Sequence, residues 1–199
     1  MLLRFSPTSP FVRKVRLAAA ILGQTLDIEP ADTQDPSDSL RRQNPLGKVP
    51  ALLTDDGEVL FDSPVILAYL DHMAGGDRIL PAEPRARIAA VRLEALADGL
   101  MDAGILVLYE ARFRPAERHE PKWLDYQAQK MTRALDALEA ATPMGDGPIT
   151  VGEIALGCAL GWLDFRFEGK WREGRPGLVA WYEAFALRCP GFEASKPVA

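Results

Sequence analysis

The hydrophobic pattern separates an alternating N-terminal third from a helical remainder. The apolar run 2–5 predicts a short strand. Ser9-Pro10 then predicts the start of a helix, because serine caps helix N-termini and proline is favoured in the first turn. Apolar residues at helical spacing continue to Leu22, and Gly23 predicts the end of this helix.

A second strand and a polar loop follow this helix. In the segment 25–29, Leu26 and Ile28 alternate with polar residues, so we expect a half-buried strand with these two side chains inward. The segment 31–43 is polar and predicts a loop with about one helical turn. A strand-helix-strand unit of this kind predicts a parallel pair of strands joined by a right-handed crossover.

A hairpin and another helix complete the alternating part of the chain. The apolar segments 51–54 and 58–61 flank Asp55-Asp56-Gly57, and the Asp-Gly pair predicts a tight turn with positive φ angles. Asp62-Ser63-Pro64 predicts the start of a helix that ends near Met73. The parallel pair and the hairpin together predict an α+β unit with a mixed four-stranded sheet.

The rest of the chain predicts helices alone. The turn-rich segment 75–84 predicts a linker between the two parts. The expected helices cover 85–113, a stretch around 124–138, a stretch opened by a Thr150–Glu153 capping box, and 176–189. We therefore expect two domains, an α+β domain over 1–76 and an all-α helical bundle over 84–199.

Composition and charge narrow the classes of function. The 199 residues carry 23 basic and 28 acidic side chains, and this net charge of -5 argues against a general nucleic-acid binder. The longest apolar run, 154–163, is too short to span a membrane, and the N-terminus does not resemble a signal peptide. Cys158 and Cys189 form no CxxC pair, and His72 and His119 belong to no metal-spaced set. We expect a cytoplasmic protein without a metal.

Four local motifs occur in order along the chain. They are Thr8–Arg16 (TSPFVRKVR), Asn44–Leu52 (NPLGKVPAL), Asp62-Ser63-Pro64, and the capping box followed by the closing helix and Pro190. Each motif is weak alone, but together they cover nearly the whole chain. In this order they resemble the glutathione S-transferase family, in particular its bacterial members with an active-site serine, such as the small YibF-like proteins.

The resemblance implies a fold, a ligand and an assembly. It implies a thioredoxin-like N-terminal domain that binds glutathione, and a helical domain that shapes the site of a second substrate. Glutathione would be the co-substrate, and a small hydrophobic electrophile or a peroxide the second substrate of a homodimeric enzyme. Two residues depart from the family pattern, since Asp62 replaces the more usual Glu and Glu153 the more usual Asp.

Ser9 is the candidate catalytic residue. Glutathione transfer needs a thiolate, whereas a free thiol with a pKa of about 8.5 is mostly protonated at neutral pH. The Ser9 hydroxyl can donate a hydrogen bond to the sulfur, and the helix N-terminus adds positive potential. Thr8 is the alternative donor, because it carries the same group one residue earlier. Without the other motifs, Ser9 would be interpreted as a helix cap only.

The remaining ligand residues follow from the resemblance. Val49 would pair its backbone with glutathione beside a cis peptide bond at Pro50. Lys48 would meet the glycyl carboxylate, or else be an ordinary surface lysine. Asp62 and Ser63, at a helix N-terminus, would bind the γ-glutamyl group.

The second-substrate site is open to several interpretations. Phe11 and a set of helical residues are candidates to line it: Met101, Ile105, Tyr109, Arg112, Trp162, Phe165 and Arg166. Asp98 and Asp102 are candidates to reach the ligand of a neighbouring subunit. A zeta-type glutathione-dependent isomerase is one alternative function, supported by Arg13, Arg112 and Arg166 if they are exposed. A non-catalytic interaction protein on the same fold is the other.

Overall fold

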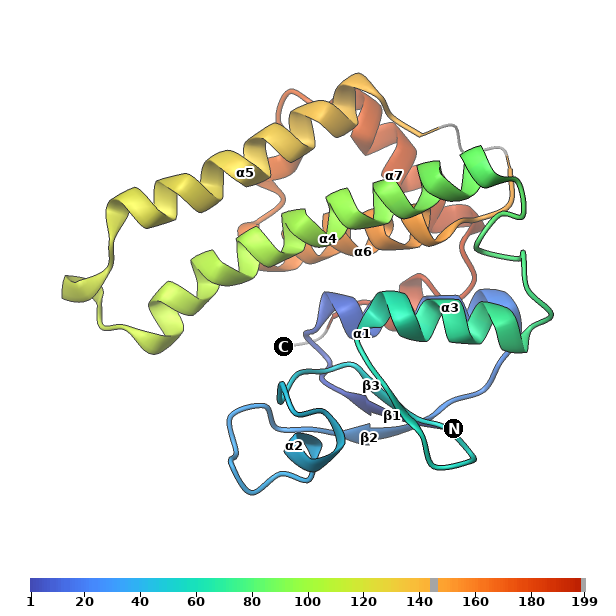
Figure 1. Ribbon diagram of the computed structural model, residues 1–199. Coiled ribbons are helices and arrows are strands. Elements are labelled where there is room, and N and C mark those ends of the chain that lie inside the picture. The colour runs from blue at the N-terminus through green and yellow to red at the C-terminus, as the bar shows by residue number, and fades with distance from the viewer. Residues whose placement is uncertain (144–146, 198–199) are drawn as a thin grey trace.

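The N-terminal part of the chain forms a mixed sheet in the order β2-β1-β3-β4 (Figure 1). The computed structural model describes residues 1–143 and 147–197. The strands are β1 (Leu2–Phe5), β2 (Asp27–Pro30), β3 (Ala51–Leu53) and β4 (Val59–Leu60). β1 pairs in parallel with β2 and antiparallel with β3, which pairs antiparallel with β4. The mixed four-stranded sheet expected from the sequence is confirmed.

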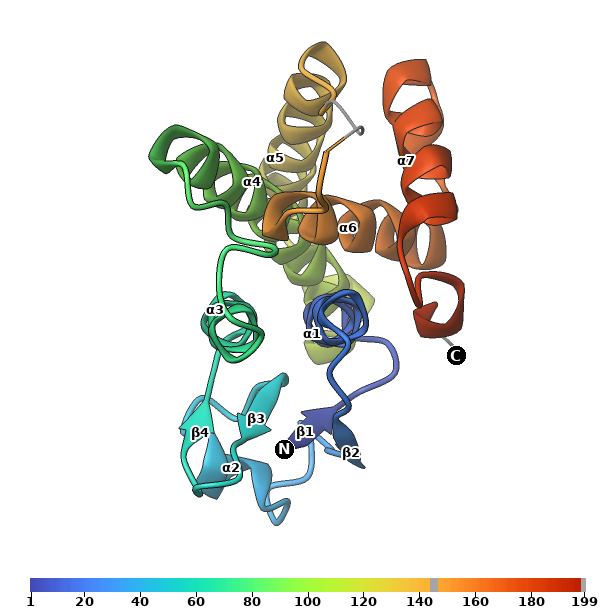
Figure 2. The same cartoon turned by 90° about the vertical axis from the view of Figure 1, so that its right-hand side faces the viewer.

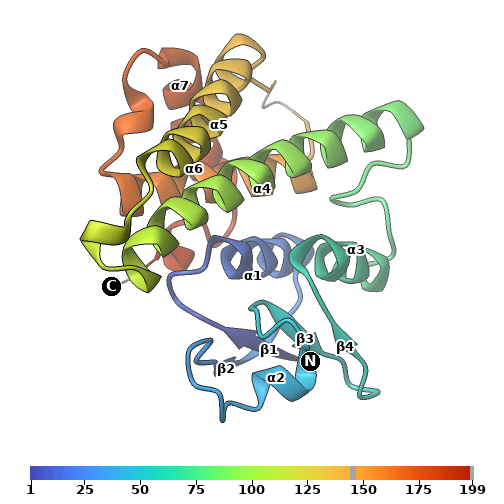
Figure 3. The same ribbon diagram turned by 60° about the vertical axis from the view of Figure 1, so that its left-hand side comes forward.

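Helices cover both faces of this sheet and form the rest of the molecule. Helices α1 and α3 lie side by side on one face, and α2 lies on the other (Figure 2). The helical part lies beyond α1 and α3, with the long α4 running across them (Figure 3). The helices are α1 (Pro10–Leu22), α2 (Leu40–Gln43), α3 (Ser63–Met73), α4 (Pro84–Phe113), α5 (Pro121–Ala140), α6 (Val151–Phe167) and α7 (Pro176–Arg188).

The second strand differs from the expectation. It begins at Asp27 rather than at residue 25, and Ile28 is 50% exposed instead of facing inward. The reason is its place in the sheet, because β2 is an edge strand that pairs with β1 alone. Leu26, just before the strand, is partly buried against the core as expected, so the expectation is wrong for Ile28 alone.

The hairpin turn also differs in detail. Gly57 alone has a positive φ angle in this turn, at +89°, whereas Asp56 does not. The Gly57 N–H donates to the Thr54 carbonyl at 3.1 Å, and the Thr54 N–H donates to the Glu58 carbonyl at 2.9 Å. These bonds describe a three-residue loop with glycine in the left-handed position, a geometry in which the aspartate needs no strained backbone.

The segment between the two parts is anchored rather than free. Ile79 is fully buried in the core, and its N–H donates to the Asp71 carboxylate at 2.8 Å. The Val151 N–H donates to the Ile79 carbonyl at 2.9 Å, which ties the segment to the start of α6. The turn-rich composition predicted a linker, and these contacts make the segment part of the packed core.

Candidate functional site

Ser9 lies where β1 passes into α1. Its Oγ accepts a hydrogen bond from the Val12 N–H at 3.3 Å and so caps the helix, while Pro10 occupies the first helical position. Thr8 is also half-buried, with its Oγ1 3.5 Å from Ser6 Oγ. Both candidate hydroxyls therefore lie at the helix end that favours negative charge. Because a hydroxyl that accepts a hydrogen bond keeps its own hydrogen, Ser9 retains a donor.

The loop before β3 presents an unpaired stretch of backbone. The Val49–Pro50 peptide bond is cis. Asn44 shapes the loop, because its Nδ2 donates to the Lys48 carbonyl at 2.8 Å and its Oδ1 accepts the Leu46 N–H at 3.0 Å. Within residues 1–143 and 147–197, the Val49 N–H and C=O make no backbone hydrogen bond. Both groups are available to an extended ligand.

Asp62 and Ser63 lie at the start of α3. Asp62 is the N-cap residue, but its side chain is exposed and makes no capping hydrogen bond. Ser63 is buried, with 1% of its surface exposed. Helices α1 and α3 begin at the same end of the molecule (Figure 1), so Ser9 and Ser63 belong to neighbouring helix N-termini. This arrangement suits a ligand with an anionic group at each helix end.

Helix α4 adds carboxylates to the same region. Burial raises the pKa of Asp102, an effect that the charge of Lys48 opposes and that of Asp62 reinforces. Lys48 in the loop before β3, Asp62 at the start of α3 and Asp102 in α4 thus influence one another electrostatically. Asp102 is a candidate ligand group within its own chain, whereas the sequence suggested only the site of a neighbouring subunit.

A buried lysine joins α1 to α4 next to this region. Lys14 is fully buried, and its Nζ lies 2.8 Å from both oxygens of Asp98. Glu94 Oε1 lies 2.9 Å from the same nitrogen. Burial, partly offset by Lys14, raises the pKa of Asp98 to about 6. Sequence analysis missed Lys14 and Glu94, although a lysine between Val12 and Val15 on an apolar helix face was a usable signal.

Two candidates for the second-substrate site belong to the core instead. Met101 is fully buried and Trp162 is 2% exposed, with its ring packed where a side chain on Gly104 would lie. The helical spacing of these two residues in the sequence therefore results from packing between α4 and α6, not from a ligand site. Among the remaining candidates, Phe11 and Ile105 are partly buried against the core, and Arg112 lies over the ring of the exposed Tyr109 at 5.5 Å.

The basic residues predicted to be exposed do not all reach the surface. Arg13 is only 4% exposed and donates to the Phe192 carbonyl at 2.9 Å and to Ser195 Oγ at 3.2 Å. It fixes the C-terminal segment to α1, so that expectation is wrong. Arg166 is exposed and lies over the ring of Phe165 at 4.5 Å.

A cavity between α4 and α5 was not predicted. Its volume is about 320 Å³. Its lining residues are Leu106, Tyr109, Glu110, Phe113, Arg114 and Trp123. Tyr109 is the single member of this group that the sequence suggested, because the others meet only when the two helices pack at their connection.

The described part of the chain offers no cluster of three or more His, Cys, Asp or Glu side chains that could hold a metal ion. Cys158 and Cys189 are unpaired and buried, and burial raises the pKa of the Cys158 thiol to about 12. Cys158 is therefore a core residue. No helix among residues 1–143 and 147–197 is long and apolar enough to cross a membrane.

Comparison with known proteins finds the same family along most of the chain. Residues 3–78 match the glutathione S-transferase N-terminal domain, and residues 93–184 match the glutathione S-transferase C-terminal domain. The uncharacterized GST-like protein YibF of Escherichia coli is 37% identical over 196 residues, which are 96% of each chain.

Solved structures agree with this assignment. A glutathione S-transferase from Methylobacillus flagellatus, with glutathione bound, superimposes with a TM-score of 0.92 at 35% identity and 99% coverage of both chains. A glutathione transferase family member from Pseudomonas fluorescens Pf-5, also with bound glutathione, has a TM-score of 0.89 at 40% identity. It covers 100% of this chain and 99% of its own. This chain belongs to the glutathione S-transferase family.

Proposed function

We propose that this protein binds glutathione across the N-termini of α1 and α3 and transfers its thiolate to a small hydrophobic electrophile. The observation that carries the proposal is the common location of these two helix N-termini, with Ser9 on one and Ser63 on the other. The unpaired backbone of Val49 provides the third contact. Glutathione-dependent reduction of a peroxide uses the same thiolate.

Ser9 stabilises the thiolate in this proposal. Its Oγ already accepts the Val12 N–H, so its free hydrogen donates to the sulfur, beside the positive end of α1. The thiolate, not the thiol, is the nucleophile, and stabilising it lowers its pKa. Ser9 acts as donor and positioner rather than as a base, and Thr8 remains the alternative donor.

Each charged group at the two ends of glutathione has a binding residue in this proposal. The γ-glutamyl carboxylate meets Ser63 at the start of α3, while Asp62 and Asp102 attract the γ-glutamyl ammonium. Lys48 meets the glycyl carboxylate. Phe11, with Ile105 and Tyr109 of α4, borders the second substrate. We also propose the division into domains 1–76 and 84–199, and a cytoplasmic location, where thiols are kept reduced.

The test is glutathione binding by calorimetry, with an electrophile-conjugation assay alongside. Ser63→Ala should weaken binding by about tenfold or more, because a hydrogen bond to a charged group contributes about 1.5–3 kcal/mol. Ser9→Ala should retain binding but lose conjugation, and Thr132→Ala, at an exposed hydroxyl of α5, should change neither. If the wild type binds no glutathione at millimolar concentration, the interaction-protein alternative replaces this proposal.

We further propose a homodimer formed through α3 and the first half of α4. Large apolar side chains are exposed on both of these helices, and exposed apolar surface is a common feature of contacts between protein chains. They are Val65, Met73, Ile88, Val91 and Leu96, with Ile88 68% exposed.

Sedimentation analysis tests this surface. Val91→Glu should convert a dimer to a monomer, because it places a charge in the apolar contact. Leu187→Glu is the control, since Leu187 is 91% exposed on α7, outside the proposed surface. A wild type that sediments as a monomer, or a Val91→Glu variant that remains dimeric, would contradict the proposal.

A further inference from the structure

A buried arginine lies on the sheet face that α2 covers. Arg4, in β1, is 2% exposed. Its neighbour Leu3 is fully buried in the core on the other face, since successive side chains of a strand point to opposite faces. Arg4 therefore occupies a position where an apolar residue would ordinarily fill the space under a helix. A buried guanidinium is tolerated only when its donors are paired.

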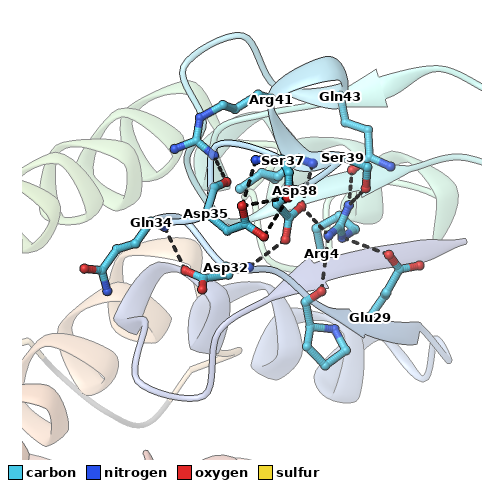
Figure 4. Close-up of polar contacts among 12 residues, drawn as sticks. Arg4, Glu29, Asp32, Gln34, Asp35, Ser37, Asp38, Ser39, Arg41 and Gln43 are labelled. Atoms are coloured by element: carbon cyan, nitrogen blue, oxygen red, sulfur yellow. Dashed lines mark hydrogen bonds and ion pairs between the residues drawn. The ribbon is translucent and has the colours of Figure 1, made fainter.

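The partners of Arg4 all lie in one stretch of chain, residues 29–43 (Figure 4). Arg4 Nη1 donates to Ser39 Oγ at 2.7 Å and to Gln43 Oε1. Nη2 donates to Asp38 Oδ1 at 2.8 Å and to the Pro30 carbonyl at 3.2 Å. Nε lies 3.4 Å from Glu29 Oε1. One side chain thus holds the end of β2 and both ends of α2.

Asp38 extends this network into the backbone. Its Oδ1 also accepts the Leu40 N–H at 2.7 Å, at the start of α2, and its Oδ2 accepts the Asp32 N–H at 2.8 Å. The backbone bonds, followed by Arg4, hold the pKa of this carboxyl below its usual range. The segment has little apolar anchorage of its own, because Leu40 is the single buried residue of α2. Polar contacts to Arg4, together with the buried Leu40, therefore hold α2 against the sheet.

Helix α2 leads directly into the loop that presents Val49. The Asn44 N–H donates to the Leu40 carbonyl at 2.7 Å and closes the helix. The Asn44 side chain, itself 1% exposed, then donates to the Lys48 carbonyl. The position of α2 therefore affects the position of Lys48 and Val49 through the contacts of Asn44. Ser9 and Ser63, by contrast, lie at the start of helices on the opposite face of the sheet.

We propose that Arg4 is a positioning residue for glutathione binding: by holding α2 it sets the position of the Lys48-Val49 loop, without acting on the thiolate. This inference rests on the proposed function. The proposal separates two properties of the site. The affinity for glutathione depends on the position of the Lys48-Val49 loop, whereas formation of the thiolate depends on Ser9.

The experiment replaces Arg4 by methionine, which keeps a long apolar side chain and removes every donor. Arg4→Met should raise the KM and Kd for glutathione about tenfold, the effect of losing contacts to a charged ligand. The kcat at saturating glutathione and the pKa of the bound thiol should stay unchanged. Arg4→Lys, which keeps the charge but not the fork of donors, should fall between. Arg172→Met, which breaks the Arg172–Asp164 pair of the helical part, is the matched control.

Trypsin supplies a readout that does not need activity. Arg41 and Arg42 lie exposed in the last turn of α2, so unwinding of α2 would let trypsin bind and cut the backbone after these two residues. Arg4→Met should be cut there several-fold faster than the wild type and the Arg172→Met control. Asp38→Ala, which disturbs the same network from the loop side, should show smaller shifts in the same directions and serves if Arg4→Met does not fold.

The outcomes separate the two proposals. If α2 stays protected from trypsin, or if cleavage accelerates while the KM for glutathione is unchanged, Arg4 is not a positioning residue. An equal fall in kcat, or a shifted thiol pKa, would also overturn the inference, because it would place the effect on the thiolate. If the wild type binds no glutathione, the proposed function fails, whatever the proteolysis shows.

Discussion

At the scale of the residue, glycines in α6 mark where helices approach most closely. A Cβ on Gly157 would lie 2.3 Å from Cε1 of Phe185, a fully buried ring of α7. That ring cannot move aside freely, because it stacks on Trp181 at 5.0 Å and meets Phe192 edge-on at 5.4 Å. A mid-helix glycine costs about 1 kcal/mol relative to alanine, so close packing must outweigh this cost.

Gly157→Ala should therefore destabilise the protein by about 1–3 kcal/mol, although alanine is the better helix former. Urea unfolding of the variant and the wild type measures the change. Phe185→Leu provides the control, because it removes the clashing edge of the ring. Adding Gly157→Ala to Phe185→Leu should cost less than adding it to the wild type. Strictly additive effects would mean that the clash does not set the cost.

The candidate site was predictable where its residues belong to local motifs. Ser9 and Ser63 are each followed by a proline at a helix start, a signal contained in two adjacent residues. The contacts of Arg4 and Lys14 were not predictable in this way, because their partners lie tens of residues away in sequence. A charged residue at an apolar position of a strand or helix shows that a partner is needed, but not which one.

At the scale of the element, helix boundaries were predicted better than strands. The capping box is confirmed, with the Thr150 N–H donating to Glu153 Oε2 at 2.9 Å and the Glu153 N–H to Thr150 Oγ1 at 3.4 Å. Such caps depend on three or four successive residues. The burial of β2 depends on which elements cover it, and an edge strand has a neighbour on one side only. The alternating pattern was correctly interpreted as a strand, but the inward orientation that it predicted for Ile28 was wrong.

At the scale of the whole molecule, one buried charge cluster joins the two parts. Lys14 of α1 faces Asp98 and Glu94 of α4, which are two carboxylates for one ammonium. Asp102 lies one turn further along α4, near Lys48 and Asp62. Burial raises the pKa of Asp98 to about 6, despite the opposing effect of Lys14. The folded protein therefore retains a proton on Asp98 at pH values where the unfolded chain has lost it.

This difference gives the stability a pH dependence of known sign. The unfolded pKa of aspartate is about 3.9, so the contribution of Asp98 to stability falls as the pH rises from about 4 to 6. Asp98→Asn should remove this dependence. The stability of the wild type relative to Asp98→Asn should decrease by roughly 2–3 kcal/mol between pH 4 and pH 7.5, since one pKa unit corresponds to about 1.4 kcal/mol.

Urea unfolding of both proteins at the two pH values measures this difference, and the titration of the other carboxylates cancels between them. Asp136→Asn is the matched control, because Asp136 pairs with Arg175 at an exposed site on α5. Its stability relative to the wild type should show no comparable change with pH. If the Asp98→Asn difference is equally constant, the pKa of Asp98 is the same in the folded and the unfolded protein, and Lys14 compensates its burial fully. The cluster would then join the two parts of the protein with the same strength at every pH in this range.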